Sequence, residues 1–172
     1  IIITGPHHEK FHFDDVSLIN DRKYMEHDVL GSLMIAKSEM NSEIITSYSD
    51  IIFENSVLDS LLQFKGDIGI AVDLNWEEKY LNRTEHPKNQ ADNVVIEDNK
   101  VVKIKKNISK YESTQQIGEF LGLMKLSDYG AEIFIKKYDE LIQSHQGKFQ
   151  DAQSIKKAYL TDLIQELIDS GM

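Results

Sequence analysis

The 172-residue sequence contains no cysteine. This absence excludes disulfide bonds, thiolate metal sites and a cysteine nucleophile, and it fits a reducing cytoplasm, where we expect the protein to be. Long apolar runs are also absent: none approaches the ~20 residues of a membrane span, and no targeting pattern opens the chain. We therefore expect no membrane association.

Positive charge is scarce, since 19 lysines and arginines stand against 29 aspartates and glutamates, for a formal net charge of −10. This balance argues against duplex nucleic acid as a partner, because affinity for it comes mainly from neutralised phosphates. The length and the 41% hydrophobic content favour one domain around one core. The sequence opens inside an apolar run and ends on a helical pattern with Gly171 as a C-cap. We expect residues 1–172 to be a single domain and an incomplete fragment.

Apolar patterns predict alternating strands and helices. The expected strands are residues 1–4, 16–20, 44–48, 67–72 and 118–126, with a hairpin over residues 94–104 that turns at Asp98 and Asn99. The expected helices lie within residues 23–40, at 57–64, after an N-cap at Ser127, and at 155–168. This order predicts an α/β fold: a three-layer sandwich with a mixed, mostly parallel sheet, in which residues 1–4, 44–48, 67–72 and 118–126 are the central strands.

The stretch EIITSYSDIIF places Asp50 directly after a predicted strand. A carboxylate buried there is unfavourable unless a cation, a backbone N–H group or water meets it. Ligands of doubly wound sheets bind beyond the carboxyl ends of the strands, so Asp50 is well placed to hold Mg²⁺. The alternative is a turn aspartate, or an N-cap of the helix predicted at residues 57–64.

With four further segments this stretch forms a series along the chain: LGSL, then SYSD with its following apolar pair and Phe53, then DIGIAVDLNW, NRTEHP and GEFLGLMKLS. In this order they resemble the nucleotidyltransferase family, and within it the phosphocholine and phosphonate cytidylyltransferases, some of which are fused to phosphoenolpyruvate mutase. The resemblance covers nearly the whole chain and implies a Rossmann-like nucleotidyltransferase topology. It also implies transfer of a cytidylyl group from CTP to a small phosphonate or phosphocholine-like acceptor, with release of pyrophosphate and with Asp50 as the ligand of a catalytic Mg²⁺.

Nucleotidyl transfer depends on positioning and on neutralising phosphate charge, so cationic side chains are candidates for the site. Lys105 and Lys106 occupy roughly the place of the family's acceptor-phosphate lysine, although the proline of that element is absent. A solvated hairpin edge is the alternative for both lysines. Arg83 lies in a loop between sheet elements and is expected to bind substrate.

Three more residues are expected at the acceptor. Glu119 lies in a glycine-flanked strand that resembles the family's acceptor-contacting segment, where a carboxylate could hold an ammonium group. Trp76 or Tyr80 could add a cation–π face, with a packed rim aromatic as the alternative for Trp76. Asp162 reaches the acceptor site in related enzymes, with a solvent-exposed helix aspartate as the alternative.

Two elements of the family pattern are not found: a glycine-rich triphosphate loop after the first strand, and a late aspartate that shares the magnesium. We therefore expect these 172 residues alone to bind nucleoside triphosphate poorly and to show negligible transfer. An exposed sheet edge predicts self-association or a companion or fused domain. Two alternatives remain: a non-catalytic module that acts as a structural or regulatory partner, and a sugar-phosphate nucleotidyltransferase.

Overall fold

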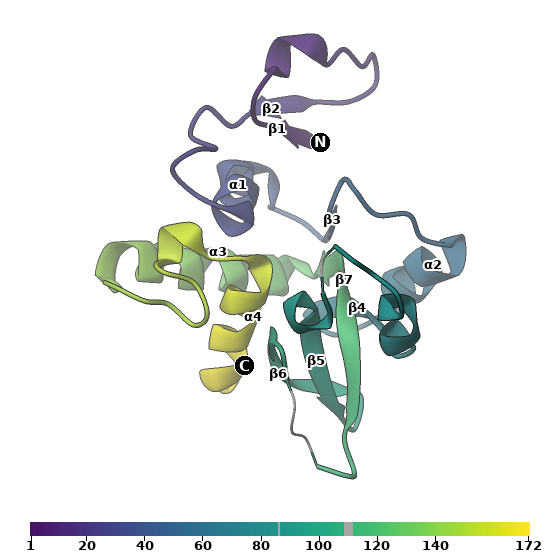
Figure 1. The fold of residues 1–172 in the computed structure, drawn as a ribbon. Helices are drawn as coiled ribbons and strands as arrows, with labels where there is room; N and C mark the ends of the chain where they lie inside the picture. The colour runs from purple at the N-terminus through teal and green to yellow at the C-terminus, as the bar shows by residue number, and fades with distance from the viewer. Residues whose placement is uncertain (86, 109–111) are drawn as a thin grey trace.

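A computed structural model describes residues 1–85, 87–108 and 112–172 (Figure 1). The helices are α1 (Val29–Ile35), α2 (Asn55–Gln63), α3 (Asp128–Ser144) and α4 (Leu160–Asp169). The strands are β1 (Ile2–Thr4), β2 (Leu18–Asn20), β3 (Ile44–Ser47), β4 (Ile68–Asp73), β5 (Asp92–Glu97), β6 (Lys100–Lys106) and β7 (Gln116–Leu126). The α/β class predicted from the sequence is confirmed.

The main sheet has five strands. Four of them follow one another in the order β3-β7-β5-β6, and β4 pairs with β7 along the edge opposite β3. All its pairs are antiparallel, and the parallel pair that the structure describes, β1 with β2, forms a separate two-stranded sheet. Two expectations are thus corrected. The main sheet is not mostly parallel, and of the four strands expected at its centre only β7 is central, because residues 1–4 lie in the other sheet and β3 and β4 each pair only with β7 in the described part of the chain. A continuous apolar run predicts a strand buried on both faces, but it carries no information about strand direction.

Strand β7 is the centre of the sheet, and its second half is buried on both faces. Leu123, Met124 and Leu126 are at most 1% exposed. In Figure 1, α3 and α4 lie on the left of the sheet and α2 on the right, so β7 lies between helical layers. Phe134 of α3 and Leu163 of α4, both fully buried, belong to the same core cluster.

The ends of two predicted elements agree with the structure. The Ser127 hydroxyl accepts a hydrogen bond from the N–H of Gly130 (3.0 Å), which confirms Ser127 as an N-cap. Asp98 and Asn99 have φ of 49° and 60°, the backbone that a two-residue hairpin turn requires, so the hairpin is confirmed.

The last helix is shorter than predicted. Ile155–Lys157 forms a 3-10 turn, Ala158 and Tyr159 are extended, and α4 begins at Leu160. The interruption follows from capping, because Tyr159 is the N-cap and the side chain of Asp162 accepts a hydrogen bond from its N–H group. The sequence did not predict this interruption, because the apolar residues keep a helical spacing from Ile155 through Ile168.

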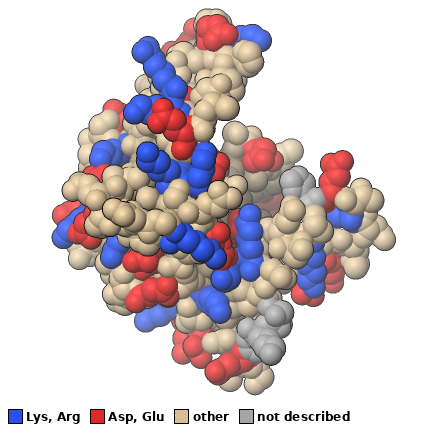
Figure 2. All heavy atoms as spheres, turned by 60° about the vertical axis from the view of Figure 1, so that its left-hand side comes forward, with Lys and Arg blue, Asp and Glu red and all other residues tan. Residues whose placement is uncertain are grey.

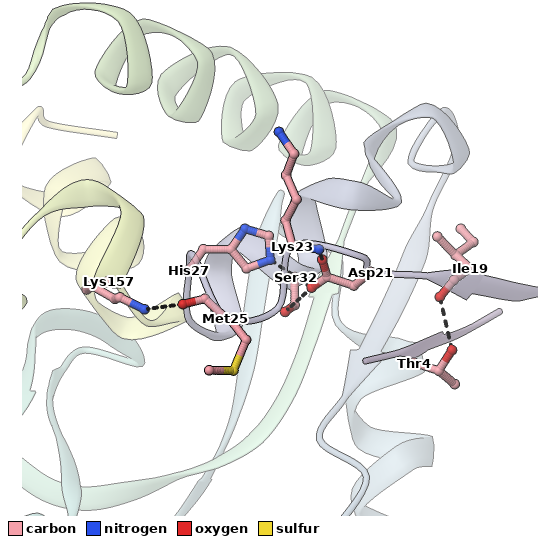
Figure 3. A network of polar contacts seen from close by, with 8 residues as sticks. All are labelled: Thr4, Ile19, Asp21, Lys23, Met25, His27, Ser32 and Lys157. Atoms are coloured by element: carbon pink, nitrogen blue, oxygen red, sulfur yellow. Dashed lines mark hydrogen bonds and ion pairs between the residues drawn. The ribbon is translucent and has the colours of Figure 1, made fainter. Parts of the chain in front are cut away.

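A buried polar network fixes α1 to the end of β2 (Figure 3). Asp21 is 1% exposed and accepts hydrogen bonds from the N–H of Lys23 (3.0 Å) and the Ser32 hydroxyl (2.8 Å), and its Oδ2 lies 2.7 Å from His27 Nε2. Burial disfavours the charged form, but these hydrogen bonds outweigh it and hold the pKa of Asp21 below its ordinary value. The network ties together the turn between β2 and α1.

Candidate functional site

Asp50 lies two residues beyond Tyr48, past the carboxyl end of β3, and its side chain is exposed. It does not cap α2, because the N-cap of that helix is Glu54. Among the described residues it has no hydrogen-bond or ion-pair partner. The carboxylate of Asp50 is therefore hydrated rather than buried, and its oxygens are accessible to a ligand.

Tyr48 directly follows β3 and is partly buried. Its hydroxyl is buried and has no hydrogen-bond partner among the described residues. Burial raises its pKa, and the negative charges of Asp92, Asp50 and Asp162 raise it further.

Asp92 is a site residue that the sequence analysis missed. It opens β5 and pairs across the hairpin with Lys106 of β6. Burial raises its pKa to about 6, the Lys106 charge opposes that shift, and the charges of Asp162 and Glu119 add to it. A register shift at Val95 and Ile96 creates this pair, since the uninterrupted hairpin would place Lys105 opposite Asp92.

A cavity of about 90 Å³ lies between β6 and α4, lined among others by Asp92, Lys105, Lys106, Asp151 and Asp162. Lys105 forms a salt bridge with Asp151 (Nζ–Oδ1 2.8 Å). The Lys106 ammonium lies 4.9 Å from the centroid of the Tyr159 ring and forms no salt bridge within the described part of the chain. Both predicted lysines therefore line a cavity, and Lys106 is the one whose charge is available to an anion.

Asp162 is not the solvent-exposed helix residue weighed as an alternative, because only 6% of it is exposed. Its Oδ2 accepts a hydrogen bond from the N–H of Tyr159 (2.8 Å), and its Oδ1 accepts one from the N–H of Asp151 (3.0 Å). Because both carboxylate oxygens accept hydrogen bonds from the backbone, the main role of Asp162 is structural: it stabilises this wall of the cavity.

The other predicted acceptor residues form a second cluster. The Tyr80 hydroxyl donates a hydrogen bond to Glu119, and burial together with this bond raises the pKa of Tyr80 to about 12. The Arg83 guanidinium lies 4.4 Å from the Tyr80 ring centroid, and Lys88 Nζ lies 5.2 Å from that of Trp76. Only 2% of Trp76 is exposed, which fits the alternative of a packed aromatic residue. The chain's own cations thus occupy both rings proposed for a ligand cation.

Asp92 lies between the two clusters, because it pairs with Lys106 of β6 and its neighbour Asn93 pairs with Glu119 of β7. Figure 2 shows lysine and arginine side chains gathered beside acidic ones near the middle of the face that α3 and α4 bring forward, although the chain as a whole is acidic.

No helix among the described residues has the length and apolarity needed to cross a membrane.

The described residues contain no group of three or more His, Cys, Asp or Glu side chains arranged to hold a metal ion. Mg²⁺ often needs only one or two carboxylates, with substrate phosphates and water completing its octahedron. The exposed carboxylate of Asp50 fits that kind of site.

No protein-family model matches the chain. Over 153 residues it is 22% identical to the CTP:phosphoglutamine cytidylyltransferase of Campylobacter jejuni, an alignment that covers 86% of this chain and 58% of the relative. Its fold is similar to that of the inositol-1-phosphate CTP transferase from T. maritima, with a TM-score of 0.62 and 16% identity. It is also similar to a Bacillus anthracis protein described as a glucose-1-phosphate thymidylyltransferase, with a TM-score of 0.54 and 11% identity.

Each structural likeness covers 90% of this chain and 53% of the solved one, so the chain spans little more than half the length of these relatives. The comparisons confirm the nucleotidyltransferase fold and the predicted resemblance to cytidylyltransferases.

Proposed function

We propose that this nucleotidyltransferase-fold chain contributes the acceptor side of a magnesium-dependent cytidylyltransferase. The enzyme transfers the cytidylyl group of CTP to a small phosphorylated acceptor, with phosphonate and phosphocholine-like compounds as the classes expected from sequence. One observation carries the proposal: Asp92 and Lys106 of the hairpin line one cavity together with Asp162 of α4, which lies more than 50 residues further along the sequence.

The reaction joins an acceptor phosphate oxygen to the α-phosphorus of CTP and breaks the bond from that phosphorus to the bridging oxygen of the β-phosphate. Pyrophosphate leaves with the electron pair of the broken bond. Mg²⁺ held by Asp50 would neutralise charge on the phosphates. Lys106 is placed to bind the acceptor phosphate, because its ammonium lines the cavity and no salt bridge within the described residues occupies it. Lys105 lines the same cavity, and its salt bridge with Asp151 holds its charge there.

A sugar-phosphate acceptor is the second candidate, and it is favoured by the names of the two solved structures. The cavity of about 90 Å³ supports the smaller acceptor instead. Direct comparison of acceptors separates the two.

The test is pyrophosphate release by the full-length gene product with CTP, Mg²⁺ and a panel of phosphonates, phosphorylated amines and sugar 1-phosphates. We expect turnover with at least one small acceptor, loss of turnover in EDTA, and a larger loss in Lys106→Ala than in the matched control Lys105→Ala. Absence of turnover with every acceptor, or equal activity of the two lysine variants and the natural protein, contradicts the proposal. The first of these results leaves the non-catalytic module as the better description.

A further inference from the structure

Two buried polar atoms in the site lack partners. Asp92 Oδ1 and the Tyr48 hydroxyl are buried, and neither makes a hydrogen bond with the described residues. Native proteins pair nearly all such atoms, because an unmade hydrogen bond leaves the cost of desolvation uncompensated. Asp92 also lines the cavity between β6 and α4, where a ligand can reach its carboxylate. An unpaired carboxylate oxygen on a residue that lines a cavity indicates that a ligand completes it.

The surroundings of Asp92 indicate which chemical group the ligand brings. A buried carboxylate needs a hydrogen-bond donor, and a cationic donor compensates its charge as well. Lys106 lies across the hairpin from Asp92 but forms no salt bridge with it, and its ammonium lines the same cavity. A ligand with an anionic end for Lys106 and a donating, cationic end for Asp92 matches this pair.

The aromatic rings of the site argue against a trimethylammonium group as that cationic end. Recognition of a quaternary ammonium uses open aromatic faces, because the group has no N–H to donate. Here cations of the chain itself lie over three rings: Arg83 over Tyr80, Lys88 over Trp76 and Lys106 over Tyr159. The predicted use of Trp76 or Tyr80 as a cation–π face for a ligand is therefore not favoured by the geometry.

We propose that Asp92 is a specificity-determining residue, whose carboxylate accepts a hydrogen bond from the primary ammonium of a phosphorylated amine and thereby selects it over its trimethylammonium counterpart. This assignment rests on the proposed function, since it takes the cavity beside β6 as the acceptor site.

Phosphoethanolamine and phosphocholine form a matched pair of probes, because they share the phosphate and the two-carbon linker and differ only in the N-methyl groups. Isothermal titration of each into the full-length gene product measures the ratio of their dissociation constants. We expect phosphoethanolamine to bind at least about tenfold more tightly, the value of one charge-assisted hydrogen bond. In Asp92→Ala the ratio should approach one, and in Asp92→Asn it should fall partway.

Asp151→Asn is the control, since its carboxylate lines the same cavity but is already bound to Lys105, and it should keep the ratio of the natural protein. Urea unfolding of each variant shows whether it is folded, and Asp92→Asn keeps the test decisive if the alanine variant is not. A ratio near one in the natural protein, an unchanged ratio in folded Asp92 variants, or no binding of either probe overturns the assignment. Pyrophosphate release with a different acceptor in the same preparation would then leave the proposed function intact.

Discussion

Replacing Asp162 with alanine should destabilise the fold before it affects binding. The carboxylate accepts two backbone hydrogen bonds, from Tyr159 at 2.8 Å and Asp151 at 3.0 Å, and only 6% of the residue is exposed. Loss of a helix cap costs about 0.5–2 kcal/mol, and loss of a hydrogen bond to a charged group about 1.5–3 kcal/mol. Since the two losses share one carboxylate, we expect the free energy of unfolding to fall by about 2–4 kcal/mol.

Urea and thermal unfolding measure this change. For a domain of this size, 1 kcal/mol moves the melting temperature by about 2–4 °C, so Asp162→Ala should melt about 5–15 °C below the natural protein. Asp151→Ala is the matched control, because it keeps the backbone N–H that Asp162 binds and removes only a half-exposed ion pair with Lys105, worth less than about 1 kcal/mol. If Asp162→Ala unfolds like the natural protein and loses only acceptor binding, then the backbone role assigned to Asp162 is wrong.

Three further predictions concern other parts of the site and its support. Asp50→Ala should unfold within about 0.5 kcal/mol of the natural protein but release pyrophosphate at least about tenfold more slowly; normal turnover would remove Asp50 from the metal site. Because the pKa of Asp92 is about 6 when folded and 3.8 ordinarily, its folded form holds the proton more tightly, so stability should fall by up to ~3 kcal/mol as pH rises from about 4 to about 6. Unfolding curves across that range should lose this slope in Asp92→Asn, and an identical slope would refute the burial of Asp92. Lys125→Met should cost about 2–3 kcal/mol in urea unfolding, since the buried ammonium donates to the carbonyls of Leu62 and Phe64 at 2.9 Å each; a neutral effect would mean that water replaces it.

Much of the fold could be predicted from local pattern. The hairpin followed from two β-branched runs around Asp98 and Asn99, and the start of α3 followed from Ser127, because turn and cap chemistry is written in a few neighbouring residues. Strand direction could not be predicted in this way. The pairing of β3 and β4 with opposite edges of β7 depends on contacts between segments more than 45 residues apart in sequence.

The same distinction between local pattern and long-range contacts applies to the residues of the candidate site. Side chains that belong to a recognisable segment, such as Asp50 and Glu119, could be selected from the sequence, and their roles in binding stay predictions. Asp92 could not be selected from the sequence. The register shift near Val95 decides which lysine lies opposite it, and no local sequence pattern predicts that shift. The environment of Asp162 was also hidden, since the break before α4 interrupts an otherwise regular helical pattern.

The product of the reaction tests the central claim most directly. Phosphorus NMR of the full-length gene product with CTP, Mg²⁺ and phosphoethanolamine follows every phosphate at once. The account predicts two mutually coupled signals of a new diphosphate ester, together with an equal amount of pyrophosphate. Signals of CDP and inorganic phosphate alone, or an unchanged CTP spectrum while phosphoethanolamine is bound, would contradict cytidylyl transfer to a phosphorylated amine.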